Sequence, residues 1–467
     1  MRILMTGATG FVGTPLARAL FLAGHELVIL SRNASSARRR VGVKGDYVQW
    51  NPLSGPPPAM AVAGVDAVFN LMGENLGAGR WTEKRKRAIY DSRVKGTAHL
   101  VAGVADANAD GIGLWVNFSA IGFYPTNRAE SFDEGGPRGE GFASDVCAYW
   151  EAAASSDNPA ARRVVLRVGT VLGANGGALE KLLPPFKAGA GGPVGAGRQM
   201  MSWIHRDDLV ALCMRCVDND SFEGVYNAVA PGPVSNANFS KALGRALGRP
   251  AVLPAPPVAL KLALGEMAQL VLDGQSIVSA RLADAGFRFQ YGNVDDALRE
   301  AAGRLPVGLN GEEHVCDRFE DFTFIDRPVE KVFEFFSDAY NLERMTPDLL
   351  RFRILGMSEE PVREGTTIDY SLRLHGLPFK WKTLIREWQA PDRFIDYQLK
   401  GPYRIWNHLH RFIPVAGGTA MTDRVDYQLP LGVLGGAAAP LVRRDVQRIF
   451  DYRHDTIIEL MEAGGAD

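Results

Sequence analysis

The chain opens with Met1-Arg-Ile-Leu-Met-Thr-Gly-Ala-Thr-Gly-Phe-Val-Gly13, the stretch that decides the fold of its first part. The apolar residues 3–5 predict a short buried strand, and the following residues turn into a helix that begins near Phe11. A second apolar run, Glu26 to Leu30, comes next at the distance that one helix and its turns require. This order of strand, glycine turn, helix and strand is typical of a parallel βαβ unit.

Three glycines, Gly7, Gly10 and Gly13, are spaced three residues apart in the first turn. That spacing suits a tight turn, a close approach of backbone N–H groups to a pyrophosphate, and close packing of helix on strand. Glycine-rich loops also occur as plain turns. Because this loop follows a strand and opens a helix, the sequence favours a dinucleotide-binding loop over a plain turn.

The residues after the second strand indicate which dinucleotide is bound. NAD-binding sheets place an Asp or Glu there for the ribose hydroxyls, whereas a basic residue accommodates a 2′-phosphate. This chain has Ser31-Arg32-Asn33, with Arg38, Arg39 and Arg40 soon after. An ordinary solvated basic loop is the alternative, but it accounts less well for Ser31 and Arg32. The sequence therefore favours NADP over NAD.

Length and composition limit the possibilities for the whole chain. With 467 residues it is too long for one ordinary core, so two or three domains are expected. Its net charge of −1 provides no electrostatic basis for binding nucleic acid or an anionic membrane. Its longest apolar stretch, Leu429 to Val442, is glycine-rich and shorter than the ~20 residues that span a bilayer. We expect no membrane span, no cleaved signal peptide and a cytoplasmic location.

The four cysteines do not suggest a disulfide framework. Cys213 and Cys216 form a C-x-x-C pair, but they lie in an apolar helical pattern from Leu209 to Val217, where residues three apart share a face. Core packing is therefore favoured over metal or redox chemistry, and no metal site is expected in the chain.

Alternating β-rich and helical segments predict an α/β Rossmann-type doubly wound parallel sheet in residues 1–302. The expected strands are Ile3–Met5, Glu26–Leu30, Ala67–Leu71, Leu114–Ser119 and Arg163–Val168. Residues 176–245 are glycine-rich and irregular apart from a helix around Asp207–Val217. A small lobe at about 247–296, with a helical segment from Val258 to Leu272, is expected at the carboxyl ends of the strands.

A linker at 303–315 precedes a second domain, 316–463, with a different pattern. A strand at Phe319–Asp326 is followed by an amphipathic helix with Pro328 at its first position. Six strand-like runs come next: Arg351–Gly356, Thr366–Leu374, Phe379–Trp388, Arg393–Leu399, Ile405–Pro414 and Ala420–Pro430. A long helix closes the chain at about Leu441–Met461. These elements predict an α+β helix-grip domain, with a sheet around a helix and a cavity between them.

Ordered motifs over residues 1–298 resemble the extended short-chain dehydrogenase/reductase superfamily, and within it the NADP-dependent epimerase-like subfamily. The motifs are Thr6-Gly-Ala-Thr-Gly-Phe-Val-Gly13, Asn70-Leu-Met-Gly-Glu-Asn75, Arg80-Trp81, Ser92-Arg-Val-Lys-Gly-Thr97, Leu172-Gly-Ala-Asn-Gly-Gly177, Leu183-Pro-Pro-Phe186, Gly191-Gly-Pro-Val-Gly195 and Trp203-Ile-His-Arg-Asp-Asp-Leu209.

The resemblance implies a set of cofactor-binding residues. The first loop would hold the pyrophosphate, Ser31 and Arg32 would face the 2′-phosphate, and Arg93 takes a helix position where other members carry an Asn. Leu71 and Met72 would lie on the adenine side, and Val171 after the strand that passes the nicotinamide. The full set is Thr6, Gly7, Thr9, Gly10, Phe11, Val12, Gly13, Ser31, Arg32, Leu71, Met72, Arg93 and Val171.

The catalytic residues depart from the superfamily, whose members use a Ser or Thr and then Tyr-x-x-x-Lys. Ser119 ends its strand as expected, but none of the twelve tyrosines has a Lys four residues later. With Trp150-Glu151 as an anchor, the Tyr position falls at Ala143 and the Lys position at Cys147. The usual proton carrier is therefore missing.

Tyr124, five residues beyond Ser119, is the candidate substitute for the missing tyrosine, and Glu74 or His205 could lie near a substrate. Each also has a structural interpretation: a packed loop aromatic, a residue that orders a loop, and a hydrogen-bonded histidine. Asp133 and Glu134 are interpreted as a solvated loop.

Residues 316–463 resemble the START-like (SRPBCC) helix-grip proteins of the cyclase/dehydrase branch. The matching stretches are Pro328-Val-Glu-Lys-Val-Phe333, Asn341-Leu-Glu-Arg-Met-Thr-Pro347, Trp381-Lys-Thr-Leu-Ile-Arg-Glu-Trp388, Pro391-Asp-Arg-Phe394 and Gly401-Pro-Tyr403. Such domains bind apolar ligands in a cavity between sheet and helix; the alternative is a cavity filled by side chains. His408 and His410 share a strand face, and a pair without a nearby carboxylate is more often structural than metal-binding.

The sequence thus predicts an NADP-dependent oxidoreductase or epimerase that acts on a small-molecule substrate and carries a domain for an apolar ligand. The alternative hypothesis is an NADP-binding sensor or assembly protein without hydride transfer. No nucleic-acid partner is expected, and the families named include both monomers and dimers.

Overall fold

The computed structural model describes residues 1–108, 111–126, 130–430 and 432–463, so Leu431, in the apolar stretch noted above, lies outside the described residues. The chain divides into two compact units, Met1–Ala302 and Gly303–Asp467. Among the described residues, no helix has both the length and the apolar character needed to cross a membrane.

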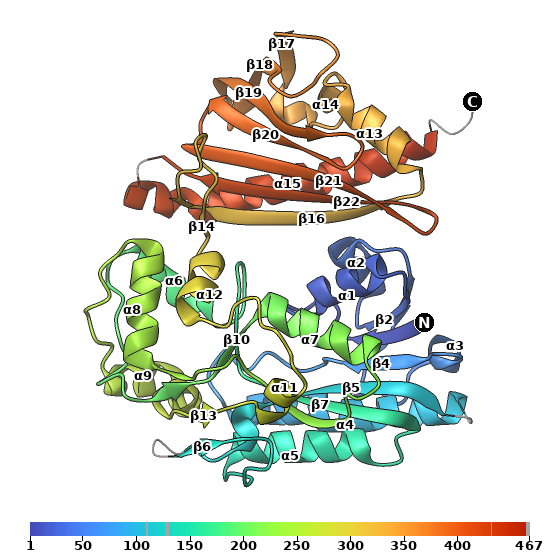
Figure 1. The fold of residues 1–467 in the computed structure, drawn as a ribbon, viewed down its shortest axis with the longest axis vertical. Coiled ribbons are helices and arrows are strands. Elements are labelled where there is room, and N and C mark those ends of the chain that lie inside the picture. Colours follow the sequence, from blue (N-terminus) through green and yellow to red (C-terminus); the bar gives the residue numbers. More distant parts are fainter. Residues whose placement is uncertain (109–110, 127–129, 431, 464–467) are drawn as a thin grey trace. The chain divides into compact units, whose positions relative to one another are not determined.

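The first unit is built on a seven-stranded parallel sheet with the strand order β11-β7-β5-β4-β1-β2-β3 (Figure 1). Its strands are β1 (Arg2–Thr6), β2 (Glu26–Ser31), β3 (Asp46–Gln49), β4 (Ala67–Asn70), β5 (Ile112–Ala120), β7 (Ala160–Val168) and β11 (Gly224–Ala228). The order reverses between β1 and β4, so the loop after β1 lies at the switch point where doubly wound sheets bind ligands.

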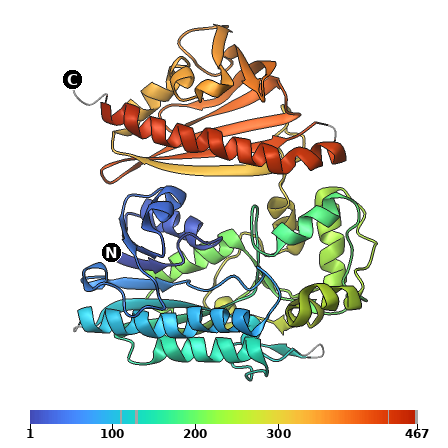
Figure 2. The same cartoon turned by 180° about the vertical axis from the view of Figure 1, so that it is seen from behind.

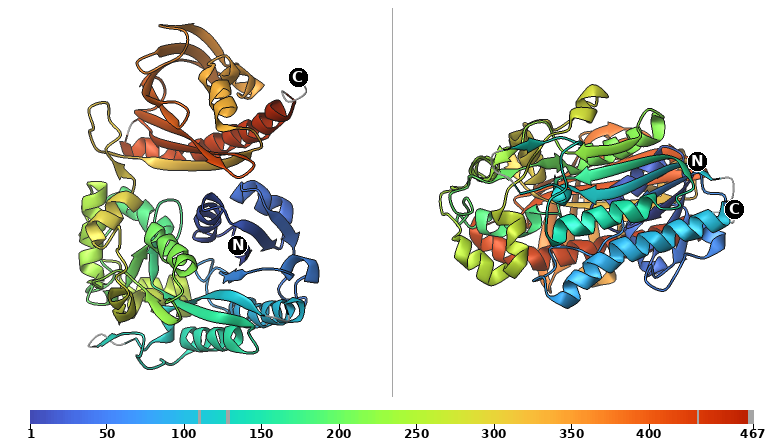
Figure 3. Two further views of the ribbon diagram at one scale, coloured as in Figure 1. Left: turned by 45° about the vertical axis from the view of Figure 1, so that its right-hand side comes forward. Right: turned by 90° about the horizontal axis from the view of Figure 1, so that it is seen from below.

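Helices cover both faces of this sheet. On one face α4 (Glu83–Ala107) and α5 (Phe142–Ser155) lie side by side, as Figures 2 and 3 show. On the other face α1 (Gly13–Leu22) packs against α2 (Ala34–Val41) and α7 (Arg206–Asp218). The α4 face buries a continuous apolar core, in which Leu100 and Val104 meet Val68 and Trp115 of the sheet.

Short elements complete the first unit. The remaining helices are α3 (Ala59–Val62), α6 (Leu179–Lys187), α8 (Asn236–Leu247), α9 (Pro257–Leu264), α10 (Gln269–Leu272), α11 (Ala280–Asp284) and α12 (Val294–Ala301), with 3₁₀ turns η1 (Ile121–Phe123) and η2 (Gly265–Ala268). The remaining strands form the pairs β8 (Thr170–Leu172) with β10 (Trp203–His205), β9 (Met200–Met201) with β12 (Val234–Ser235), and β6 (Ser131–Phe132) with β13 (Ser276–Ile277).

The second unit is a seven-stranded antiparallel sheet with the order β16-β22-β21-β20-β19-β18-β17. The strands are β16 (Asp317–Ile325), β17 (Arg353–Met357), β18 (Thr367–Leu374), β19 (Leu377–Gln389), β20 (Arg393–Lys400), β21 (Ile405–Val415) and β22 (Gly418–Gln428). A short hairpin of β14 (Arg304–Leu305) and β15 (His314–Val315) precedes them.

The helices of the second unit are α13 (Val329–Ser337), α14 (Asn341–Arg344), the 3₁₀ turn η3 (Asp348–Leu350) and α15 (Gly432–Ala463). In Figure 2 the long α15 runs along the sheet. Phe333 of α13, Phe412 of β21 and Ile457 of α15 belong to one apolar core between the sheet and the helices. Burial of each such side chain contributes roughly 1.5–3 kcal/mol. The parallel sheet and the helix-grip arrangement are both confirmed.

The structure also departs from the sequence-based boundaries. Strands β3 and β11 at the two sheet edges were not expected, and Pro328 precedes α13 as its N-cap instead of opening it. The expected helix Val258–Leu272 is split into α9, η2 and α10, because Gly265 adopts a left-handed conformation (φ +61°) that ends α9.

Candidate functional site

The turn between β1 and α1 accepts only glycine at two of its three glycine positions. Gly7 has a positive φ of +69°, and a Cβ added there would lie 2.6 Å from the carbonyl oxygen of Leu71. A Cβ on Gly13 would lie 2.1 Å from the carbonyl oxygen of Gly7. Real Cβ atoms do not approach so closely, so side chains here would force the turn open. The turn therefore leaves backbone, and not side chains, facing the site at the start of α1.

Buried hydroxyl and amide groups fix the carboxyl ends of β1 and β4 beside this turn. The Thr6 hydroxyl donates to Asn70 Oδ1 at 2.7 Å, and the backbone N–H of Leu71 donates to Thr6 Oγ1 at 3.2 Å. The Asn70 amide donates in turn to Thr97 Oγ1 on α4 and to Asn117 Oδ1 on β5. This network holds the backbone of Leu71 close to Gly7.

The glycine-rich stretch 173–177 makes room for Phe11. A Cβ on Gly176 would lie 2.4 Å from the Phe11 ring, and one on Gly177 would lie 2.8 Å from that ring and from the carbonyl oxygen of Val171. The guanidinium of Arg206 lies over the Phe11 ring, 5.6 Å from the ring centre. Gly177 therefore lies between the Phe11 ring and the backbone of Val171, two residues that the resemblance assigns to the same cofactor.

Ser31 ends β2 beside the glycine turn, and Arg32 follows it. The Ser31 hydroxyl donates to the carbonyl oxygen of Asn33 at 3.1 Å, and Asn33 caps α2 by accepting from the Ser36 N–H. Arg32 is exposed, and no residue in the described part of the chain pairs with its guanidinium. The three following arginines lie in the last turn of α2, where Arg38 stacks on Tyr47 at 4.7 Å. Arg32 is therefore the guanidinium available to an anion at this strand end.

Met72 and Arg93 lie on the other side of the turn. Met72 is buried against Gly96 of α4, whose added Cβ would meet the Met72 sulfur at 2.8 Å. Arg93 donates to the carbonyl oxygen of Glu74 at 3.0 Å and stacks on the Trp150 ring at 5.1 Å. Burial lowers the pKa of Arg93, although the value stays far above neutrality for a guanidinium.

Ser119 and Tyr124 are connected by a buried ion pair. The Ser119 hydroxyl donates to Glu151 Oε1 at 2.6 Å, and Arg167 donates to both Glu151 oxygens at 2.9 and 2.8 Å. Arg167 also donates to the Tyr124 hydroxyl oxygen at 2.8 Å, and that hydroxyl donates to Asn227 Oδ1 at 2.7 Å. The structure thus brings the two candidate catalytic hydroxyls into one polar network.

The centre of this network is the charged pair of Arg167 and Glu151, and its end is the neutral phenol of Tyr124. Burial alone would lower the pKa of Arg167, but the Glu151 carboxylate outweighs burial and raises it. Burial raises the pKa of Tyr124, and the hydrogen bonds from Arg167 and to Asn227 only partly offset this effect. Tyr124 is therefore a protonated phenol at neutral pH.

Sequence reasoning missed the central pair, Glu151 and Arg167. The available signal was a charged residue, Arg167, inside the otherwise apolar run 164–168. It was also wrong about Glu134, which is not simply solvated: Glu134 Oε1 accepts from the Asn227 N–H and from the Ser279 hydroxyl, both at 3.0 Å. The spacing of these residues in the sequence does not predict their hydrogen bonds and ion pairs, because the partners lie on elements far apart in the chain.

The other candidate residues have structural partners. Glu74 forms an ion pair with Arg85 at 2.9 Å. His205 is fully buried; its Nδ1 accepts from the Asp207 N–H at 3.2 Å and caps α7, and its Nε2 contacts Glu300 at 2.9 Å. Cys147, at the position of the usual Lys, is a buried thiol whose pKa burial raises to about 11.

The second unit contains a small pocket, with a volume of about 50 Å³, between its sheet and helices. Most of its lining is apolar, including Phe336, Leu342, Met345, Ile385, Trp388 and Phe394. Five polar residues share the lining: Ser337, Asp338, Asp396, His410 and Arg453. A mainly apolar wall with a few convergent polar groups is typical of a site for a small molecule.

Family profiles match three successive parts of the chain. Residues 3–228 match the NAD dependent epimerase/dehydratase family, and residues 255–301 match a domain of unknown function, DUF1731. Residues 317–462 match the polyketide cyclase / dehydrase and lipid transport family.

Curated relatives cover the first of the two units. The epimerase family protein SDR39U1 homolog of Arabidopsis thaliana, described as chloroplastic, is 38% identical over 307 residues, which are 64% of this chain and 86% of the relative. SDR39U1 of Mus musculus is 35% identical over 304 residues, 64% of this chain and 99% of the relative.

Solved structures give the same result. Human SDR39U1, crystallised with NADPH, has a TM-score of 0.57 and 33% identity over 65% of this chain and all of that one. A nucleoside-diphosphate sugar epimerase from Corynebacterium glutamicum has a TM-score of 0.51 and 29% identity, over 68% of this chain and 59% of that one. On these matches the chain belongs to the SDR39U1 epimerase family of short-chain dehydrogenase/reductase proteins, and it carries a polyketide cyclase/dehydrase-type (SRPBCC) domain after the epimerase part.

Proposed function

We propose that the chain is an NADP-dependent oxidoreductase or epimerase with a second, ligand-binding domain. In this proposal residues 1–302, with their lobe at 247–296, bind NADP and a small-molecule substrate. Residues 316–463, after a linker at 303–315, bind an apolar ligand. The observation that carries the choice of NADP is Arg32. Its exposed guanidinium has no partner among the described residues and lies at the strand end where NAD-binding sheets carry a carboxylate. The NADPH in the human relative supports the same choice.

The residues around the first turn fit a dinucleotide. The space that Gly7 and Gly13 keep free of side chains lies at the start of α1, where helix N–H groups and the helix dipole favour a pyrophosphate. Arg32 would grip the 2′-phosphate with two N–H groups, and the Ser31 hydroxyl would turn from the Asn33 carbonyl oxygen to donate to it. When bound, NADP would accept a hydride and NADPH would supply one; the remaining residues of the set would hold and orient the dinucleotide.

In this proposal Ser119 orients the substrate oxygen and Tyr124 carries the proton. Tyr124 differs from the usual catalytic tyrosine, because no lysine lowers its pKa and burial raises it instead. At neutral pH it would therefore act as an acid that donates a proton to a developing alkoxide. Arg167, which donates to the Tyr124 oxygen at 2.8 Å, would stabilise the phenolate that remains.

The second candidate function is a NADP-binding sensor or assembly protein without hydride transfer. One observation favours it: the hydroxyl protons of Ser119 and Tyr124 are both already donated, to Glu151 and Asn227. Transfer of deuterium from 4-deuterated NADPH into metabolites of a cell extract separates the two functions. Labelled product is expected for the enzyme, and binding of NADPH with no label in any product is expected for the sensor.

The test of cofactor choice is Arg32→Ala. Loss of a bidentate contact to a charged group removes about 1.5–3 kcal/mol, so we expect NADPH to bind roughly 10- to 100-fold more weakly while NADH affinity stays unchanged. Calorimetric titration of both cofactors measures this. Arg40→Ala, an equally exposed arginine at the end of α2, is the matched control. Unchanged NADPH affinity in Arg32→Ala would show that the phosphate assignment is wrong.

A further inference from the structure

Four ionisable side chains meet on one face of the antiparallel sheet of the second unit. Asp396 of β20 is the register partner of His408 of β21, and His410, two residues further on, is the register partner of Asp423 of β22. Residues that are directly opposite or two apart share a face. His408, His410 and Asp423 are buried, whereas the Asp396 side chain keeps 24% of its exposure. Asp396 and His410 line the pocket described above.

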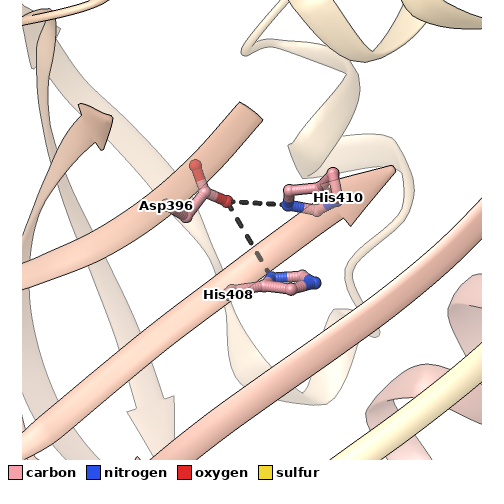
Figure 4. A group of neighbouring side chains, drawn as sticks. All are labelled: Asp396, His408 and His410. Atoms are coloured by element: carbon pink, nitrogen blue, oxygen red, sulfur yellow. Dashed lines mark hydrogen bonds and ion pairs between the residues drawn. The ribbon is translucent and has the colours of Figure 1, made fainter. Parts of the chain in front are cut away.

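Three atoms of this cluster are spaced like the ligands of a metal ion. Asp396 Oδ2 lies 3.1 Å from His410 Nε2 and 3.9 Å from His408 Nδ1, as Figure 4 shows. Bonds of 2.0–2.1 Å to a tetrahedral ion place neighbouring ligand atoms about 3.3 Å apart. All three donor atoms lie within 4.8 Å of one another. An ion would therefore fit once the ligand atoms that lie too far apart move closer together.

The other ring nitrogens are held by a single carboxylate. Asp423 Oδ1 lies 2.7 Å from His408 Nε2 and 2.9 Å from His410 Nδ1. Histidines that bind metals usually donate their second N–H to such a carboxylate, which fixes the tautomer and the orientation of the ring. Donation by both rings to Asp423 leaves the lone pairs of His408 Nδ1 and His410 Nε2 facing the Asp396 carboxylate.

That arrangement places three electron-rich atoms together, so a positive charge is needed between them. Two candidates exist: a proton on His410 or a metal ion. A metal ion would displace that proton, as metal binding to histidine generally does.

Arg453 adds a second, independent sign of a ligand. It lines the same pocket, is 7% exposed, and its Nε is buried without a hydrogen-bond partner. Its Nη2 lies 3.7 Å from Asp423 Oδ1 and 3.4 Å from His410 Nδ1, on the same side of the cluster as Asp423. A buried donor without a partner is unfavourable by roughly 1–3 kcal/mol, so an oxygen atom from a bound molecule would be stabilised there.

We propose that Asp396, His408 and His410 bind one divalent transition-metal ion at the wall of the pocket. Two imidazole nitrogens and one carboxylate oxygen suit Zn²⁺ or Fe²⁺, and such three-ligand sites keep coordination positions open. With Asp423 and Arg453 included, the cluster would carry a net charge of +1. The open positions therefore favour an anionic oxygen, such as a carboxylate or an enolate, on the molecule in the pocket. Only this last step rests on the proposed apolar-ligand function.

His205, Asp207 and Glu300 form another cluster of potential metal ligands among the described residues. Unlike the first cluster, it has no histidine nitrogen with a free lone pair. His205 Nδ1 already accepts a backbone N–H, and its Nε2 is placed to donate to Glu300. With the tautomer set in this way, no nitrogen lone pair of His205 is left for an ion.

The test uses the full-length, untagged protein, stripped with a chelator and then dialysed against Zn²⁺ or Co²⁺. We expect one ion per chain by elemental analysis and visible Co²⁺ bands of a site with nitrogen ligands. Asp396→Asn and His408→Gln should lower the affinity more than 100-fold. Asp423→Asn, which removes only the group that orients both rings, should lower it about 10- to 100-fold. His375→Gln, an exposed histidine paired with Asp445 in the same unit, is the matched control.

Circular dichroism of each variant distinguishes loss of the ion from loss of the fold, and the nearly isosteric Asp396→Asn is the decisive variant. Metal bound equally by folded Asp396→Asn and by the wild type would overturn the proposal. So would a stripped protein that binds no ion and whose His410 nitrogen shifts stay those of an imidazolium in excess Zn²⁺; the cluster would then be an ion-pair network only. Binding of the apolar dye ANS is measured separately, so failure of the ligand proposal does not imply failure of the metal proposal.

Discussion

Glu151 and Arg167 show how a charged pair can be stable inside the first unit. Their side chains are only 13% and 7% exposed, and the carboxylate meets the guanidinium through two N–H groups. Removing one partner of a buried pair leaves an uncompensated charge. We expect Glu151→Gln to lower the free energy of unfolding of this unit by about 3–5 kcal/mol, measured by urea denaturation.

The control for this prediction is Asp145→Asn, because Asp145 pairs with Arg138 at the surface, with side chains 49% and 43% exposed. Exposed pairs contribute about 0–1 kcal/mol. Equal losses in both variants would mean that burial does not determine the strength of the Glu151–Arg167 pair.

Tyr124 allows a prediction with a defined pH dependence. Because burial raises its pKa, the phenol stays protonated through neutral pH and loses its proton only above the ordinary value of about 10. If Tyr124 donates the proton, activity persists across neutral pH and falls on the alkaline side above that value. Tyr124→Phe should lower the rate of deuteride transfer by about 10²- to 10⁴-fold with NADPH affinity unchanged. A Tyr124→Phe variant with full activity would leave the phenol a structural role only.

At the scale of elements, the glycine-rich stretch 173–177 acts by shaping the start of α1. A Cβ on Gly176 would overlap the Phe11 ring, so Gly176→Ala must move either Phe11 or the stretch itself. We expect NADPH affinity to fall about tenfold, since a displacement of the turn weakens several backbone contacts of about 1 kcal/mol each. Gly79→Ala is the control, because an added Cβ there meets nothing within 4 Å. Fluorescence titration with NADPH measures both; unchanged affinity in Gly176→Ala would separate Phe11 from the cofactor site.

The elements that the sequence could predict are those with strong local signals. The apolar run 3–5, the glycine turn and the strand at Glu26 identify a βαβ unit, and the period-two patterns after residue 350 correspond to the antiparallel strands. Strand β3 (Asp46–Gln49) was not expected, because its residues are only partly buried and mixed in polarity. Edge strands have one unpaired side and need not be apolar, so they give the weakest signal.

Contacts between side chains on different strands could not be predicted from the sequence. The sequence placed His408 and His410 on one strand face, but it gave no carboxylate near them. The structure brings Asp396 and Asp423 beside them from the two neighbouring strands, because sheet register joins residues 12 and 13 positions apart. Register depends on turn lengths and bulges along the whole sheet, so it cannot be read from the residues of the site alone.

At the scale of the whole molecule, the two units have separate sheets and separate apolar cores. A unit that buries its own core can fold without the other. We therefore expect a fragment of residues 1–302 to fold alone and to bind NADPH with the affinity of the full chain, within a factor of about two.

The complementary fragment, residues 303–467, should fold alone, bind ANS and retain the metal site, since Asp396, His408, His410 and Asp423 all belong to its own sheet. Thermal unfolding of both fragments and of the full chain measures this. Independent units predict two transitions in the full chain at the midpoints of the fragments. A fragment 1–302 that binds NADPH much more weakly than the full chain would instead mean that the second unit contributes to the cofactor site. A role in raising the local concentration of an apolar substrate requires only that both units stay on one chain. Cleavage of the chain at the boundary between the units, after Ala302, should then lower turnover of a dilute substrate while leaving NADPH affinity unchanged.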